Sequence, residues 1–168
     1  MEIINNFLPN SAFDFLNKKL LDKYFPWYHQ NSKVLDDDNE EQFTHLFYSD
    51  ETQYSNKAYL LKPIFDKLNV KILIRAKINL TLKEDNIRPF NYHMDFAQCN
   101  TAIFYLNTNN GKTLFKDGQE IESVANRVVI FPSELEHTGT THTDKKYRIV
   151  LNINYVKELN GNIKSRII

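Results

Sequence analysis

The sequence predicts a mainly β fold: a jelly roll, or double-stranded β-helix, with N-terminal α-helices packed on one sheet. Two observations favour it. Apolar residues recur at helical spacing only before about residue 69 of the 168 residues. Beyond that point, apolar and polar residues alternate in one long run and several shorter ones, with turn residues between them. Strands of this length and spacing are typical of β-sandwiches and barrels.

Two amphipathic helices are expected in residues 1–69, as a support for the β region. The first is predicted over about 11–24, where Ser11 is a typical cap and the apolar residues that follow share one face. The second is predicted over about 54–68, and Pro63 should kink it or split it in two.

The segment between the two helices, about 25–50, is polar, and we expect it to be mostly loop or edge structure. Its run Asp36-Asp37-Asp38 lacks the alternating ligands and the glycine of a calcium loop, so we expect a solvated surface turn there. The tail from Leu159 onward is expected to be loosely ordered.

Residues 70–156 are expected to form the jelly-roll core. Its first strand, about 70–82, has one apolar face and one largely polar face. The polar face carries Arg75, Lys77 and Asn79. From the sequence, this face either looks into the barrel and touches a ligand, or is solvated at a sheet edge. Further strands are expected at about 90–93, 100–107, 112–115, 119–124, 127–131, 136–141 and 146–156.

Composition limits the classes of partner. The formal net charge is +0 and the pI is about 7.0, so no basic surface field attracts nucleic acid. Cys99 is the only cysteine, which rules out an internal disulfide and suits a reducing compartment. The first residues lack the basic and apolar regions of a signal peptide, and no stretch reaches membrane-spanning length. We expect a single domain over residues 1–168 in a soluble protein, with neither nucleic acid nor membrane as partner.

The candidate metal ligands begin with His93 and Asp95, which are one residue apart. On an extended segment, residues i and i+2 project to the same face, so both side chains can reach one point. Two histidines and one carboxylate are the ligand set of non-haem Fe(II) oxygenases, and His137 would complete it. A histidine and an aspartate at this spacing also occur by chance, so the interpretation depends on the residues downstream.

Arg148 is the candidate for anion binding. In the last strand it shares a face with Val150, Asn152 and Asn154, while the opposite face is apolar. If the apolar face takes the helices, Arg148 points into the barrel, where a guanidinium is costly without an anion. No carboxylate on the facing strands is an obvious partner, and the planar fork suits a carboxylate ligand. Tyr105 is expected on an inward face too, where its hydroxyl is either a second donor to that anion or satisfied by the backbone.

Together these residues resemble the prolyl 4-hydroxylase-like group of 2-oxoglutarate and Fe(II)-dependent oxygenases, and are most similar to the small single-domain forms of phages and marine bacteria. The resemblance implies that His93, Asp95 and His137 bind iron. It also implies that Arg148 pairs with the far carboxylate of 2-oxoglutarate and that Tyr105 assists it. The resemblance covers about 70–156 and rests on His93-Met94-Asp95, Thr101 to Asn107, Val128 to Ser133, His137 and Arg148.

Asn79 and the turn 110–113 are expected near the cosubstrate and the substrate, respectively. Asn79, on the polar face of the long strand, is taken as a further cosubstrate contact. Members of the group usually carry a Gly-Gly-Glu-Thr-like turn before the fourth strand, whereas this chain reads Asn110-Gly111-Lys112-Thr113. The departure concerns the substrate-side loop more than the metal centre.

The function that the resemblance implies is hydroxylation of an aliphatic C–H with Fe(II), 2-oxoglutarate and O2. We expect it in the cytoplasm, that of the host if the protein is viral. The expected substrate is a peptidyl proline or another protein side chain, or a small molecule. Two other classes stay open. A cupin-like metalloenzyme without a cosubstrate would use the three ligands but would not need Arg148, and a non-catalytic jelly-roll binding module would need none of these residues.

The remaining histidines and the cysteine are expected to be structural. His29 and His45 are interpreted as surface or packing residues. His142 lies five positions after His137, so on a strand it faces the opposite side. Cys99 has no ligand-type neighbour at metal-site spacing, and we expect it to be a small buried apolar residue.

Overall fold

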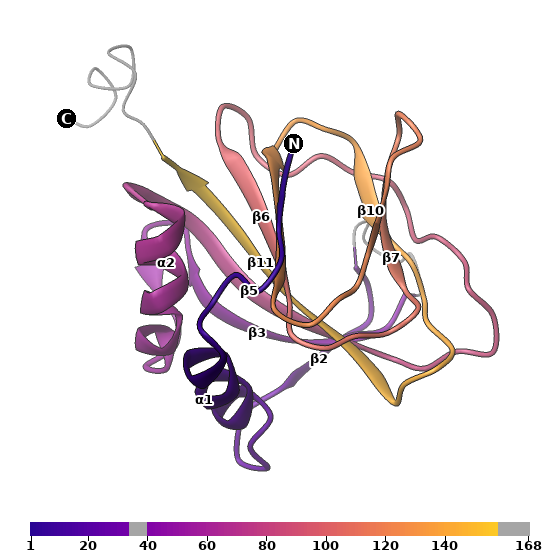
Figure 1. The fold of residues 1–168 in the computed structure, drawn as a ribbon, viewed down its shortest axis with the longest axis horizontal. Coiled ribbons are helices and arrows are strands. Elements are labelled where there is room, and N and C mark those ends of the chain that lie inside the picture. Colours follow the sequence, from indigo (N-terminus) through magenta and orange to yellow (C-terminus); the bar gives the residue numbers. More distant parts are fainter. Residues whose placement is uncertain (34–39, 158–168) are drawn as a thin grey trace.

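The structure, a computed structural model, describes residues 1–33 and 40–157. It is mainly β, and its antiparallel strands form the predicted jelly roll (Figure 1). The acidic run Asp36-Asp37-Asp38 and the tail from Leu159, for which the sequence predicts a surface turn and loose order, lie outside the described residues.

The strands of the described chain belong to a large sheet of eight strands and a small sheet of three. The large sheet has the order β1 (Glu2–Ile4), β9 (Arg127–Pro132), β6 (Asn100–Tyr105), β11 (Tyr147–Val156), β5 (Ile72–Leu82), β3 (Gln42–Ser49) and β2 (Tyr28–Gln30), with β4 (Thr52–Gln53) paired to β3. The small sheet has the order β10 (His137–Gly139), β7 (Lys112–Phe115) and β8 (Glu120–Glu122). An apolar cluster between the sheets joins them, formed by Ile103, Tyr105, Phe115, Ile121, Val129 and Phe131.

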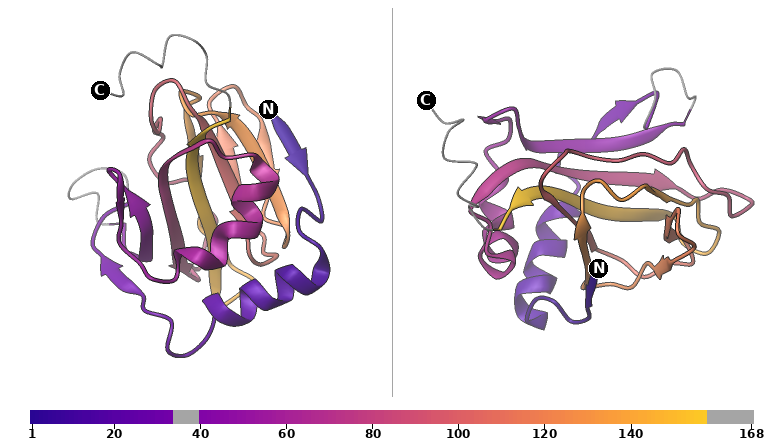
Figure 2. Two further views of the ribbon diagram at one scale, coloured as in Figure 1. Left: turned by 90° about the vertical axis from the view of Figure 1, so that its left-hand side faces the viewer. Right: turned by 90° about the horizontal axis from the view of Figure 1, so that it is seen from above.

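The helices pack on the outer face of the large sheet, away from β7 and β10 (Figures 1 and 2). The first is α1 (Asn10–Leu20), which begins after Pro9, so Ser11 lies in its first turn and is not the cap. A 3-10 helix, η1 (Ala58–Leu61), leads into α2 (Lys62–Leu68). Pro63 lies in the first turn of α2, where its missing N–H is harmless, and this is the split that the sequence predicts. Within the described ranges, none of the helices combines the length and the apolar character that crossing a membrane requires.

The main core lies between these helices and the large sheet. Leu16 and Leu20 of α1 pack in the same cluster as Ile64 and Leu68 of α2. On the sheet side, the cluster contains every second residue of β11, as the alternation of its sequence predicts. These residues are Ile149, Leu151, Ile153 and Tyr155.

The prediction of mostly loop or edge structure over 25–50 is wrong in its main part, because β3 is a paired strand inside the large sheet, between β5 and β2. Its polar residues are buried and hydrogen-bonded instead of solvated. His45 is 4% exposed, and its ring nitrogens lie 2.8 Å from the carbonyl oxygen of Pro26 and 2.7 Å from the hydroxyl of Ser55. Both partners are remote in sequence, so local polarity alone suggests a loop. His45 is therefore a packing histidine, as expected.

The strand predicted over 90–93 is also wrong. In the described chain, this region makes isolated bridges instead, Pro89 with Thr140 and His93 with His137. The second bridge brings two of the candidate metal ligands next to each other.

The polar face of β5 lies inside the jelly roll. β5 lies between β11 and β3, so it is not an edge strand. Its residues Ala76 and Ile78 belong to the core under the helices, and Arg75, Lys77 and Asn79 line the cavity on the other side. Of the two alternatives left open by the sequence, the inward one is correct. The inward residues of β11 and β5 pair in successive rows: Asn154 with Arg75, Asn152 with Lys77, Val150 with Asn79, and Arg148 with Thr81.

Candidate metal centre and cavity

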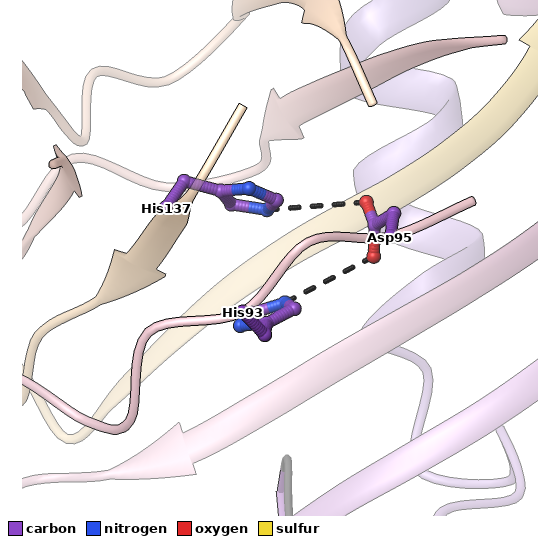
Figure 3. Close-up of side chains that lie close together, drawn as sticks. All are labelled: His93, Asp95 and His137. Atoms are coloured by element: carbon purple, nitrogen blue, oxygen red, sulfur yellow. Dashed lines mark ion pairs between the residues drawn. The ribbon is translucent and has the colours of Figure 1, made fainter. Parts of the chain in front are cut away.

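Three side chains with metal-binding atoms, His93, Asp95 and His137, converge in the jelly roll (Figure 3). Their ligand atoms all lie within 4.8 Å of one another. The Nε2 atoms of His93 and His137 each lie 3.9 Å from a different carboxylate oxygen of Asp95. The structure therefore brings together the three residues that the sequence singles out as ligands.

Backbone hydrogen bonds bring these residues together from distant parts of the chain. His93 lies in the loop before β6, and His137 opens β10. The amide of each donates to the carbonyl oxygen of the other at 3.0 Å, and the amide of Asp95 donates to the carbonyl oxygen of Ser133 at 3.0 Å. The positions of all three Cα atoms are thus fixed by the fold and not by side-chain contacts alone.

The surroundings of the two imidazoles suit metal binding in different ways. The Nδ1 atom of His137 lies 2.9 Å from the carbonyl oxygen of Leu135, and because that oxygen can only accept, Nδ1 carries the proton. The lone pair is then on Nε2, the atom that faces Asp95. Burial lowers the pKa of His93 and favours its neutral form. Neutral imidazole is the form of histidine that binds metal ions.

Asp95 is held ionised by three side chains of the large sheet. Arg75 Nη2 donates to Oδ1 at 2.9 Å, while Thr101 Oγ1 and Asn154 Nδ2 donate to Oδ2 at 2.8 and 2.9 Å. Burial alone would raise the pKa of Asp95, but the charge of Arg75 and the hydrogen bonds from Asn154 and Thr101 hold the pKa below its usual value. The carboxylate is therefore charged, oriented and 2% exposed.

This donor set fits a divalent first-row transition metal. Two neutral imidazoles and one carboxylate leave the opposite positions of an octahedral ion free for other ligands, which is the arrangement of non-haem Fe(II) sites. Ligands on one face of an octahedron with bonds of about 2.1 Å lie about 3 Å apart. The 3.9 Å separations here would therefore have to close by about 1 Å for the three side chains to hold an ion.

The three residues lie on the wall of a cavity of about 390 Å³, a volume typical of small-molecule sites. Its floor is the inward face of β5 and β11, and its other walls come from the small sheet and the loop that carries His93. Lining residues include Lys33, Gln42, Arg75, Lys77, Asn79, Thr81, Phe90, His93, Asp95, Ile103, Thr113, His137, Gly139, Arg148, Val150 and Asn152.

Arg148 lies on the wall of the same cavity, and its side chain points inward as the alternation of β11 predicts. It is 5% exposed, and burial lowers its pKa. Its Nε donates to Ser123 Oγ at 2.9 Å, and Nη2 donates more weakly to the Lys112 carbonyl and Thr113 hydroxyl oxygens, both at 3.4 Å. Within the described ranges, no carboxylate pairs with this guanidinium, so the cavity has a buried cation without a protein counter-ion.

Comparison with solved structures gives the fold a name. The chain superimposes on a Pseudomonas putida prolyl-4-hydroxylase with a TM-score of 0.60 and 15% identity, covering 94% of this chain and 92% of that one. A Trichoplax adhaerens prolyl hydroxylase, solved with a peptide fragment of the hypoxia inducible factor oxygen degradation domain, gives a TM-score of 0.65 and 15% identity over 93% and 83%. The chain has the fold of the 2-oxoglutarate oxygenases. A non-heme alpha ketoglutarate dependent epimerase from nogalamycin biosynthesis shares it, with a TM-score of 0.62 and 12% identity over 92% and 77%. Neither a family model nor a curated protein sequence matches the chain.

Within this oxygenase fold, the turn that departs from the prolyl hydroxylase-like pattern packs on Arg148. A Cβ added to Gly111 would lie 2.9 Å from Arg148 Cδ, 2.9 Å from Asn109 Oδ1 and 3.1 Å from the Thr141 carbonyl oxygen. Gly139 lies on the guanidinium, with Nη1 3.4 Å from the place of its missing Cβ. The glycines leave the room that the arginine occupies, so the turn 110–113 is part of the Arg148 pocket.

The two other expected cosubstrate contacts, Tyr105 and Asn79, differ in whether they line the cavity. Tyr105 is fully buried, its hydroxyl donates to Thr113 Oγ1 at 2.7 Å, and its ring centroid lies 5.8 Å from Arg148 Cζ. Tyr105 therefore packs near Arg148 and does not itself line the cavity. Asn79 lines the cavity, and its buried Oδ1 has no hydrogen-bond partner in the described structure. The same is true of Thr81 Oγ1 and Asn152 Oδ1, so the cavity floor presents several unsatisfied oxygens.

Sequence reasoning missed the side chains that hold Asp95. It placed Arg75 on a polar face without a partner, and it did not single out Thr101 or Asn154 for this role. The signal that could find them is the strand register, since Asn154 pairs with Arg75 on one side and with Thr101 on the other. This register brings three inward polar side chains into one row beneath the carboxylate.

The remaining histidines and the cysteine stay outside the triad. His29 is exposed on β2, and His142 is buried and does not join the three ligands. Cys99 differs from the expectation of a buried apolar residue. It is only partly buried, and its Sγ lies 3.0 Å from Ser133 Oγ. Its thiol is therefore part of a polar network next to Asp95, through Ser133 and Thr101.

Proposed function

We propose that this protein is a 2-oxoglutarate- and Fe(II)-dependent dioxygenase that hydroxylates an aliphatic C–H. In this proposal His93, Asp95 and His137 hold Fe(II), and Arg148 binds the far carboxylate of 2-oxoglutarate. The bound metal would supply O2 activation coupled to oxidative decarboxylation of 2-oxoglutarate to succinate and CO2. All other contributions come from the protein, which binds, orients and shields the reactants.

The observation that carries the proposal is the buried guanidinium of Arg148 in the cavity of the metal-ligand triad. A buried cation without a counter-ion costs several kcal/mol, and a dicarboxylate cosubstrate would remove that cost. A cupin-like metalloenzyme would need the three ligands but gives no reason for Arg148. A non-catalytic jelly-roll module gives no reason for either.

The other residues of the cavity have supporting roles in this proposal. Arg75 and its neighbours keep Asp95 charged, and the Leu135 carbonyl keeps the lone pair of His137 on the metal-facing nitrogen. Tyr105 and the Gly111 turn fix the position of Arg148. Asn79, on the cavity floor, is a contact for the bound cosubstrate.

The substrate is a protein or peptide side chain or a small molecule. One structural neighbour is a prolyl hydroxylase with a bound peptide, which supports a peptidyl proline as one candidate. Another is a non-heme alpha ketoglutarate dependent epimerase from nogalamycin biosynthesis, which supports a small molecule as the other candidate. The charge of this chain's own cavity distinguishes these classes further.

The proposal is tested by measuring succinate formed from 2-oxoglutarate after addition of Fe(II), with and without O2. The decisive variant is Arg148→Met, and the matched control is Arg127→Met, because Arg127 lies on β9 outside the cavity. Loss of one partner of a desolvated ion pair costs on the order of 2 kcal/mol or more. The Kd of 2-oxoglutarate should therefore rise roughly thirtyfold in Arg148→Met and stay unchanged in the control.

Two results would contradict the proposal. Equal 2-oxoglutarate affinity in wild type and Arg148→Met would remove the cosubstrate assignment and favour the cupin-like class. Absence of Fe(II) or Mn(II) binding would favour a non-catalytic module.

A further inference from the structure

Lys77 is a second cation of the cavity wall without a protein partner. It lies on β5 next to Arg75 on the same inward face, and both line the cavity. Arg75 is paired with Asp95 at 2.9 Å. Lys77 makes neither an ion pair nor a side-chain hydrogen bond within the described residues. An ammonium in this position is costly unless an anion enters the cavity.

Burial supports the same conclusion. Desolvation, helped by the charge of Arg75 and opposed by that of Asp95, lowers the pKa of Lys77 to about 8. A lysine with a strongly lowered pKa in a cavity is a candidate ligand-binding group. A methionine or leucine would fill the same space at no electrostatic cost.

The remaining lysine of the cavity differs from Lys77. Lys33 Nζ lies 3.7 Å from a carboxylate oxygen of Glu40 and 3.3 Å from the ring centroid of Phe90. Its charge is already balanced by the protein. Lys77 is therefore the cavity lysine that leaves an anion to be supplied.

In the proposed function the far carboxylate of 2-oxoglutarate is already paired with Arg148, whereas the charges that act on Lys77 are those of Arg75 and Asp95. Successive inward rows of the sheet lie about 7 Å apart, because the strand rises about 3.4 Å per residue. Lys77 is one row from Arg75, which holds Asp95, and two rows from Thr81, which pairs with Arg148. It thus lies near the metal end of the cavity, about 14 Å along the strand from the row of Arg148.

The charge of the loaded site points to the substrate. This step rests on the proposed function. A divalent metal, Arg148, Arg75 and Lys77 together carry five positive charges, against one negative charge on Asp95 and two on 2-oxoglutarate. Two positive charges thus stay uncompensated at the metal end after the cosubstrate has bound. An uncharged peptide segment would leave this excess in place.

We infer that the primary substrate carries a carboxylate close to its reacting C–H, and that Lys77, next to Arg75, binds this carboxylate. Lys77 is thus a specificity-determining residue, and the substrate class is a small carboxylic acid of about amino-acid size. The cavity of about 390 Å³ has to hold the reacting part of this acid together with the cosubstrate.

The test uses Mn(II)-substituted protein saturated with 2-oxoglutarate, and acetate as the probe. Paramagnetic relaxation of the acetate methyl protons reports acetate near the metal. Acetamide is the neutral match of acetate. The variant is Lys77→Met, and the control is Lys83→Met, because Lys83 is exposed just beyond the end of β5 and does not line the cavity. Relaxation of water protons on the same samples measures binding of Mn(II) itself, and a titration measures binding of 2-oxoglutarate.

Acetate should show saturable relaxation in wild type and in Lys83→Met. The Kd of acetate should be at least tenfold higher in Lys77→Met than in wild type. In wild type, acetamide should bind at least tenfold more weakly than acetate. Equal effects of acetate and acetamide would overturn the inference, as would an acetate Kd unchanged in Lys77→Met, which would mean direct binding to the metal. An acetate effect that is present without 2-oxoglutarate and absent in the saturated protein would mean that Lys77 serves the cosubstrate, which also overturns the inference. If Mn(II) or 2-oxoglutarate fails to bind, the proposed function is refuted, and this inference with it.

Discussion

The position of Lys77 also predicts an effect on the free energy of unfolding, which can be measured without metal or substrate. Methionine matches lysine in length and flexibility and carries no charge, so Lys77→Met removes the half-buried ammonium and keeps the packing. Each pKa unit corresponds to about 1.36 kcal/mol, and the pKa of Lys77 falls from 10.5 to about 8, which sets a ceiling of about 3 kcal/mol on the cost of the charge. Because the side chain borders a solvent-filled cavity, we expect the variant to be about 2 kcal/mol more stable than wild type at pH 7.

The pH dependence gives the sign of this effect. Between about pH 8 and 10.5 the unfolded chain binds more protons at Lys77 than the folded one does, so the stability of wild type rises with pH in this window. The cost is fully present below about pH 8 and vanishes above about pH 10.5. The advantage of Lys77→Met should therefore shrink as the pH is raised.

The assay is urea unfolding of the metal-free proteins at pH 7 and pH 10, with Lys83→Met as the control for loss of an exposed lysine. A Lys77→Met protein that is less stable than wild type at pH 7 would refute the reasoning. So would an advantage that is equal at the two pH values.

Three further predictions concern the metal centre and the Arg148 pocket. Gly111→Ala should displace Arg148, because overpacking at a 2.9 Å contact costs at least about 1 kcal/mol. Calorimetry should then show a Kd of 2-oxoglutarate raised by about tenfold and an unchanged affinity for Mn(II). Gly118→Ala, at a glycine with a φ of 90° and no heavy atom near its missing Cβ, should lower stability without this change in Kd. Asp95→Asn should weaken Mn(II) binding at least about a hundredfold with an unchanged far-UV circular dichroism spectrum, since the loss of a ligand exceeds that of a supporting residue. Thr101→Val removes one donor to Asp95 and should weaken Mn(II) binding by about tenfold, and equal affinity would mean that this hydrogen bond does not orient the carboxylate.

The parts of the structure that follow a local period could be predicted from the sequence. Alternation in β11 is enough to place Arg148 inside, because one face of the strand is apolar and must meet the helices. The split at Pro63 follows from the chemistry of proline in the same way. In both cases a physical rule acts on neighbouring residues.

The parts that depend on partners remote in sequence could not be predicted. β3 appears as a polar loop because the groups that satisfy His45, from Pro26 and Ser55, have no local signature. The pairing of Arg75 with Asp95 depends on the register between β5 and β11 and on the path of the loop before β6. Neither is determined by a pattern within one segment.

The division of the three candidate metal ligands between the two sheets has a mechanical consequence. Asp95 is held by side chains of β5, β6 and β11 in the large sheet, whereas His137 belongs to β10 of the small sheet and carries His93 with it through their paired amides. An ion bound by all three is therefore a cross-link between the sheets, and pulling the small sheet away would require breaking metal bonds. Because a metal that binds only where the three side chains converge stabilises that arrangement, metal binding and the packing of the two sheets would be thermodynamically linked. Exchange of the β10 amide protons with solvent then reports directly on metal occupancy.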